Sequence, residues 1–316
     1  MLSFLAKHSS VFLILAGVAG FLFPSLSAAI FPYLPQVLFF LMLLTLLGMN
    51  QNQLVKTLFK ANVWRYTFVH SVLLTIISCT IAKLIGGSDS FMLAIAGVTA
   101  TGSLFATPAI ARSIGLDTLE AMAMTIASTL AMPVILFINL LIFQDNDFQL
   151  DLVSYAQRLL IFLAGPMLFS AIVYRFVPNP LLLRVHEKLS QVTIILVFSF
   201  PFGLVGPFRG VFDQSLSSGL FYSAVGVALC VLFFAVGYFL FRKQGDTNAA
   251  ILAATASVNR NVLLTYTVAG SYLGPEFIIL MGAIQIPTSA LPLFIRWLKP
   301  RLEKRKQQES EIASSH

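Results

Sequence analysis

Residues 254–263, "ATASVNRNVL", place an arginine between two asparagines inside a run that otherwise has the composition of a membrane-spanning helix. Apolar residues precede it in "AAILA" and follow it in "VLLTYTVAG". A charged side chain at the centre of a bilayer costs at least ~2.5 kcal/mol, so Arg260 needs a specific partner. Two roles are open: a clamp on backbone carbonyls of a facing segment, or contact with a substrate or an ion pathway.

The composition around this stretch is that of a polytopic membrane protein. Of the 316 residues, 58% are hydrophobic and 10% are charged, whereas a soluble domain carries about 25% charged residues. The apolar residues come in runs of roughly 20, which is the length of a membrane-spanning helix. The net charge of +7 does not indicate nucleic-acid binding, because six of the basic residues gather at and after the end of the last apolar run, in "RWLKPRLEKRK", residues 296–306.

Hydropathy predicts ten spans and therefore an all-α polytopic membrane protein. The predicted segments are 9–23, 34–49, 63–85, 91–110, 119–143, 155–177, 192–211, 220–241, 248–269 and 277–298. With ten spans both termini lie on one side, and 16 of the 20 basic residues fall on that side. Three basic residues (Lys83, Arg158 and Arg209) fall on the other. This bias predicts cytoplasmic termini in a bacterial inner membrane.

The two halves of the chain resemble each other at an offset near 154 residues. "LPQV" at 34–37 is similar to "LSQV" at 189–192, "TGS" at 101–103 to "TAS" at 255–257, and Pro133 to Pro287. We therefore predict one five-helix repeat in residues 1–150, a second in 151–300, and a cytoplasmic tail in 301–316. Since five is odd, the repeats must have opposite orientations, which is a signature of secondary transporters.

Equivalent positions of the two repeats carry unusually polar crossings. The fourth segment contains Thr101, Ser103 and Thr107, and the ninth contains Thr255, Ser257, Asn259, Arg260 and Asn261. Freed backbone groups find no partners in lipid, so two interrupted helices at matching positions indicate a binding site. The simpler alternative is that small residues let helices approach closely.

Further polar residues join these candidates. Thr125, Ser128 and Thr129 share one face of the fifth segment, where they could line a cation site or hydrogen-bond back to their own helix. Gln285 in the tenth segment is a further candidate, while His70 in the third is more typical of a helix–helix hydrogen bond than of a proton relay. No predicted midplane position carries a carboxylate that could neutralise Arg260.

The arrangement resembles the bile acid:sodium symporter family over nearly the whole chain. The similar elements are "LFFLMLLTLLGMNQNQL", "SLFATPAIARSIGLD" with "TIASTLAMP", and "NRN" followed by "GAIQIPTSALPLF". The resemblance implies a panel of spans one, two, six and seven, and a core whose fourth and ninth helices cross near sodium and an organic anion. By position, Thr125 matches a hydroxyl that the family places near sodium, and Ser128, on the same face of the fifth segment, is a second candidate ligand. The chain departs from the family at Leu104-Phe105, where the family has an asparagine, and at Thr255, where it has an acidic residue.

The leading functional hypothesis is a secondary transporter of a small organic anion, coupled to sodium. One alternative is sodium-independent exchange or efflux, with the charge of Arg260 standing where sodium would sit. Another is a non-transporting membrane receptor or partner protein. Catalysis is not expected, because no recognisable catalytic motif occurs, and sodium is the only cofactor that the sequence suggests. The expected partners are the organic anion, the lipid bilayer and a second copy in a homodimer, with no nucleic acid.

Overall fold

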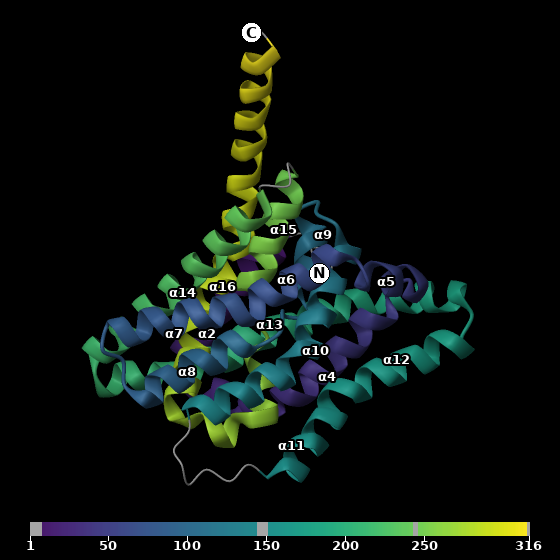
Figure 1. Ribbon diagram of the computed structural model, residues 1–316. Coiled ribbons are helices and arrows are strands. Elements are labelled where there is room, and N and C mark those ends of the chain that lie inside the picture. Colours follow the sequence, from purple (N-terminus) through teal and green to yellow (C-terminus); the bar gives the residue numbers. More distant parts are fainter. Residues whose placement is uncertain (1–7, 144–150, 243–245, 315–316) are drawn as a thin grey trace.

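The computed structural model describes residues 8–143, 151–242 and 246–314, which form helices joined by short connections (Figure 1). In this part of the chain no strand forms, and seven helices are long and apolar enough to cross a membrane. The sequence-based prediction of an all-α membrane protein is confirmed at this level.

The first half of the chain contains α2 (Ser9–Leu22), α3 (Pro24–Ile30), η1 (Phe31–Tyr33), α4 (Leu34–Leu47), α5 (Gln51–Leu58), α6 (Ala61–Phe68), η2 (Val69–Leu73), α7 (Leu74–Leu84), α8 (Asp89–Ala100), α9 (Thr107–Ser113) and α10 (Thr118–Phe143). The second half contains α11 (Leu152–Leu159), η3 (Leu160–Ala164), α12 (Gly165–Phe176), α13 (Asn179–Gln214), α14 (Leu216–Arg242), α15 (Thr247–Val258) and α16 (Val262–Ser314). Both η2 and η3 are single π-helical turns.

The helices depart from the predicted segments in three ways. The second span begins at Pro24, because prolines stand in the first turns of α3, η1 and α4, where a missing N–H costs nothing. The seventh predicted segment lies inside the longer α13, which begins at Asn179 and whose apolar span is Ile195–Gln214. The ninth predicted segment is divided between α15 and the start of α16, and the tenth lies in α16 beyond the non-helical Gly274.

Three apolar helices are shorter than a full span: α2, α8 and α15. The last two end at the polar crossings. Helix α8 stops at Ala100 and α9 starts at Thr107, while α15 stops at Val258 and α16 starts at Val262. The two interruptions are therefore residues 101–106 and 259–261.

Two groups of helices pack side by side. Helix α13 contacts α2, α3 and α4, and α12 contacts α4. In the other group α7 packs on α8, and α14 packs on α15 and α16. Ser27 shows how closely the first group fits: its hydroxyl donates to the carbonyl of Gly203 at 3.1 Å. That carbonyl is available because Pro207, four residues later, has no N–H to donate.

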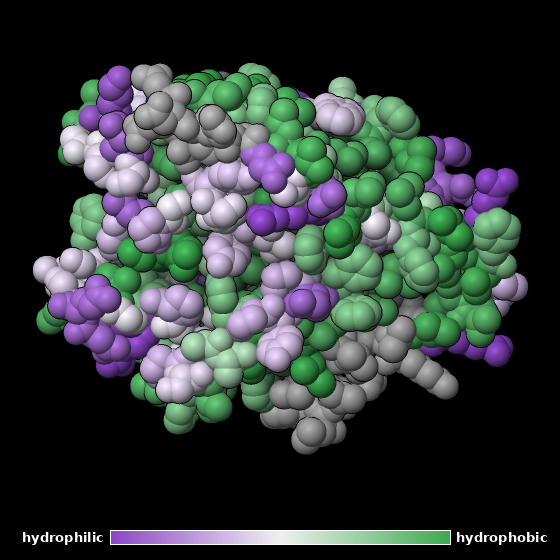
Figure 2. Space-filling view, turned by 90° about the horizontal axis from the view of Figure 1, so that it is seen from below, coloured by the Kyte–Doolittle hydropathy of each residue, from purple (hydrophilic) through white to green (hydrophobic). Residues whose placement is uncertain are grey.

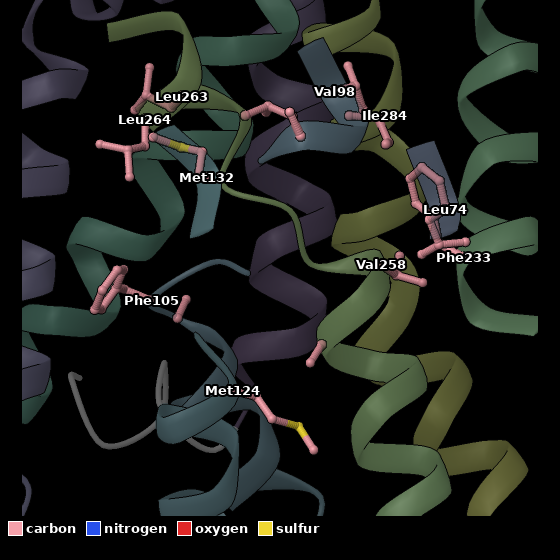
Figure 3. Packing of buried hydrophobic residues seen from close by; sticks show 14 of the residues in the cluster. Leu74, Val98, Phe105, Met124, Met132, Phe233, Val258, Leu263, Leu264 and Ile284 are labelled. Carbon is pink, nitrogen blue, oxygen red and sulfur yellow. The ribbon is translucent and has the colours of Figure 1, made fainter. Parts of the chain in front are cut away.

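Apolar side chains cover much of the face that Figure 2 shows. Leu84, Phe59 and Phe176 are each at least three-quarters exposed, at 81%, 76% and 76%. Such a surface is typical of helices that face lipid. Most of the buried hydrophobic residues form one cluster, with Phe105, Met132 and Leu263 among its members (Figure 3).

Candidate functional site

The two interruptions cross and bind each other through their backbones. The N–H of Leu104 donates to the carbonyl of Asn259 at 2.7 Å, and the N–H of Asn261 donates to the carbonyl of Gly102 at 2.8 Å. Together these bonds make an antiparallel bridge between Ser103 and Arg260. Backbone groups that no helix satisfies thus find partners in the opposite interruption, as a lipid environment requires. We call residues 101–106 and 259–261 together the crossing.

Helix α10 lies directly against the crossing. The hydroxyl of Ser128 accepts the N–H of Ser103 at 3.0 Å. A Cβ atom placed on Gly102 would lie 2.5 Å from Oγ1 of Thr129 and 2.6 Å from its Cα. Thr125, Ser128 and Thr129 are all fully buried, so the predicted polar face of this helix does meet the fourth span.

Arg260 is the most strongly held side chain of the crossing. Its Nη1 donates to the carbonyl of Thr99 at 2.6 Å, and its Nη2 donates to the carbonyl of His70 at 2.9 Å. Its Cζ lies 4.1 Å from the centroid of the Phe233 ring, a cation–π contact. The side chain is only 4% exposed. Of the two roles that the sequence left open, the structure shows the clamp on backbone carbonyls; contact with a substrate stays a prediction.

No carboxylate neutralises this guanidinium in the described part of the chain, where the only ion pair is Arg209–Asp213. An arginine side chain stays protonated at neutral pH. The crossing therefore contains a buried positive charge that only neutral protein groups surround. Such a site favours an anion.

His70 holds the first interruption from a third helix. Its Nε2 lies 2.9 Å from the carbonyl oxygen of Thr101, and its Nδ1 lies 2.9 Å from the hydroxyl of Tyr66. A carbonyl can only accept, so Nε2 carries the proton and Nδ1 accepts from Tyr66. The prediction of a helix–helix hydrogen bond for His70 is confirmed.

We expect replacement of His70 by leucine to lower the stability of the protein by about 2 kcal/mol, because the carbonyl of Thr101 loses the side-chain donor that His70 supplies. Thermal unfolding in detergent measures this. Tyr66→Phe is the matched control: it leaves the bond to Thr101 in place and should cost less. Equal melting of His70→Leu and wild type would contradict this positioning role.

The predicted hydroxyl groups mostly hydrogen-bond back to their own helices. Thr101 donates to Val98, Thr125 to Ala121, Ser128 to Met124 and Thr255 to Ile251, at 3.0, 2.9, 2.8 and 2.6 Å. Ser103 and Thr107 pair with each other across 3.1 Å. For Thr125 and Ser128 the structure thus shows the alternative in which the hydroxyl binds its own helix, although each oxygen keeps a free lone pair.

Gln285 is not joined to the crossing by a hydrogen bond. It lies in α16 beyond the kink at Gly274, and its side-chain amide makes no hydrogen bond to any described residue. The backbone carbonyl of Gln285 accepts a hydrogen bond from the hydroxyl of Ser289 at 2.7 Å. The prediction that Gln285 takes part in the site therefore has no support from this geometry.

Several fully buried polar atoms at the crossing have no partner within the described protein. They are Nδ2 and Oδ1 of Asn259, Nδ2 of Asn261, Nε of Arg260, Oγ1 of Thr129 and Oγ of Ser257. Folded proteins leave few such atoms, and each normally has a partner in water, an ion or a ligand. Three of these six atoms are nitrogens that donate N–H bonds, and two are hydroxyl oxygens that can donate or accept. The side-chain carbonyl oxygen of Asn259 is the one atom of the six that can only accept. The set suits an anionic ligand better than a cation.

Two residues of the site escaped sequence reasoning. Tyr66 precedes His70 by four residues and so shares its helix face, a spacing that could have revealed it. Phe233 is one of 29 phenylalanines, and no pattern distinguishes it from the others.

No family model matches the chain, and the curated proteins contain no match to it. The likeness to the bile acid:sodium symporter family therefore remains a resemblance of motifs. The function has to be inferred from the geometry of the crossing.

Proposed function

We propose that the protein is a secondary transporter of a small organic anion, with the crossing as its binding site. One observation carries this proposal: two interrupted helices from opposite halves of the chain pair at their breaks around a buried charge and unpartnered donors. A purely structural helix bundle does not need interrupted helices, since each break exposes backbone groups to lipid. For this reason the non-transporting receptor is the weaker alternative.

The proposed architecture is ten spans in two inverted repeats. The first repeat runs through residues 1–150 and the second through 151–300. Its support comes from matching packing: α7 contacts α8 ahead of the first interruption, and α14 contacts α15 ahead of the second. Seven long helices and three shorter apolar ones supply ten spans if α16 is divided at Gly274: α15 and the part of α16 before Gly274 then form the ninth span, and the rest of α16 forms the tenth. The termini would then share the cytoplasmic side of a bacterial inner membrane.

A topology experiment tests this architecture. Reporter fusions after Asn62 and Pro178 should both indicate cytoplasm, because the basic residues concentrate on that side. A fusion after Asp147 should report the opposite side, and a fusion after Lys243 should report the cytoplasm. Both positions lie outside the described residues. A cytoplasmic signal at Asp147 would contradict the ten-span arrangement.

The proposed substrate is an anion because of the charge and the donors. Arg260 uses two of its five N–H groups on carbonyls, so three remain for a ligand. The side chains of Asn259 and Asn261 add two unpartnered NH₂ groups from the same interruption. A carboxylate accepts several such N–H bonds at once, and charge-assisted bonds of this kind are about twice as strong as neutral ones.

The first candidate mechanism is sodium coupling, which the resemblance implies, with Thr125 as the matching ligand and Ser128 beside it on the same helix face. Sodium-independent exchange is the second candidate mechanism. The second is favoured by a specific observation, since a guanidinium already lies among the backbone carbonyls of the crossing. Hydroxyl oxygens without a carboxylate make a weak sodium site. The two candidates predict different dependence on a sodium gradient.

Uptake into proteoliposomes from a panel of organic anions tests the proposed function. We expect at least one small carboxylate to accumulate, and protein-free liposomes are the control. Each anion is measured with and without an inward sodium gradient, which separates symport from exchange. Failure of every anion, with protein that is folded and inserted in both orientations, would contradict the proposal.

A further inference from the structure

Two carbonyl groups beside the crossing have lost their helical donors. In an α-helix the carbonyl of Thr99 would accept the N–H of Ser103, but that N–H donates to the hydroxyl of Ser128. The carbonyl of His70 would accept the N–H of Leu74, but the π turn η2 directs that N–H to Val69. Both oxygens are buried, and both point to the guanidinium of Arg260.

A third group completes the arrangement. The ring of Phe233, from α14, is fully buried and presents its face 4.1 Å from Cζ of Arg260. Two carbonyl oxygens and an aromatic face are all groups that attract positive charge. The carbonyl of Thr99 also lies in the last turn of α8, where the helix dipole is negative.

We propose that the carbonyls of Thr99 and His70 and the ring of Phe233 form a cation-binding site, which the chain fills with its own guanidinium. The arginine side chain is then a tethered cation that neutralises the end of α8 and the π turn. Since this charge is covalently attached, the crossing requires no free cation in order to hold its shape or to attract an anion. This last consequence rests on the proposed transport function, whereas the cation site itself does not.

Chemical rescue tests the site directly. Arg260→Ala removes the guanidinium and leaves both carbonyls and the ring in place, so the variant should melt well below wild type. Millimolar guanidinium should restore most of the lost melting temperature, because the free ion fits the position of the missing group. Urea at the same concentration has a similar shape but no charge, and should restore nothing.

Arg65 provides a matched control. It also donates to a carbonyl, that of Leu240 at 2.8 Å, and stacks over a ring, that of Phe241 at 5.0 Å, but it is exposed. Guanidinium should therefore leave the melting temperature of Arg65→Ala unchanged. Equal responses of the two variants, or no response of Arg260→Ala, would overturn the proposal.

Wild-type protein supplies a second measurement, which decides the matter if Arg260→Ala does not fold. Replacement of sodium by choline should leave both the melting temperature and the anion uptake of wild type unchanged. A melting temperature that rises with sodium concentration and not with choline would overturn the tethered-cation proposal. Absence of uptake under every condition would instead count against the transport function, since rescue and melting do not depend on transport.

Discussion

Gly102→Ala should lower the stability of the protein by about 3 kcal/mol or more, because it forces a methyl group into the backbone of α10. A Cβ atom at this position would lie 2.6 Å from Cα and 2.7 Å from the N of Thr129. Backbone atoms cannot rotate away as a flexible side chain can. The first interruption would have to move, and the bond from Asn261 to the carbonyl of Gly102 would be lost with it.

The matched control for this variant is Gly210→Ala in α13. A Cβ atom there meets no atom within 4 Å, and alanine has the higher helix propensity. The control should melt at or slightly above the wild-type temperature. Both variants are measured by thermal unfolding in detergent and by the size-exclusion profile. Wild-type melting of Gly102→Ala would show that the close contact with Thr129 does not exist.

Arg260→Gln should have the second large effect, on stability and on transport together. The carbonyls of Thr99 and His70 lose charged donors, and an unsatisfied buried carbonyl costs about 1–3 kcal/mol. The crossing also loses its positive charge, so accumulation of anions should stop. Thermal unfolding and proteoliposome uptake measure the two consequences separately.

Arg260→Lys separates the two roles of the arginine. It keeps the charge but loses the planar fork that can reach two carbonyls and a carboxylate together. We therefore expect a folded protein with markedly weaker carboxylate uptake. If Arg260→Gln melts at a lower temperature and yet transports normally, the arginine is a structural clamp alone and the anion-binding role is wrong.

The interruptions were predictable because their cause is local. Three residues of "NRN" and the run from Thr101 to Thr107 are too polar for a lipid-facing helix, and the structure breaks both helices there. The offset between the halves also indicated that the two polar segments belong together. What the pattern could not show was that Leu104 and Asn261 donate across the crossing, since backbone pairing depends on tertiary position.

The partners of Arg260 were beyond sequence reasoning for a different reason. The carbonyl of His70 is available because the π turn in "VHSVL" directs the N–H of Leu74 to Val69. The amino-acid composition of a segment does not reveal such a turn. Phe233 lies 27 positions before Arg260, in a helix that is mostly apolar and contains several other phenylalanines. Helix lengths were also hard to predict, because hydropathy does not detect that α13 and α16 continue beyond the membrane-length segment.

Asn259→Ala tests most directly whether the crossing binds the transported anion. Both polar atoms of this side chain are buried without a partner, so their removal should leave the melting temperature unchanged or raise it. Asn261→Ala is the contrasting variant: its Oδ1 accepts the N–H of Leu264 at 3.3 Å, and the loss of this cap should destabilise the protein by about 1 kcal/mol. In proteoliposomes, Asn259→Ala should take up the anion at least ~10-fold less well, the equivalent of about 1.4 kcal/mol of binding energy. Wild-type uptake by a normally folded Asn259→Ala would contradict the assignment of the crossing as the binding site.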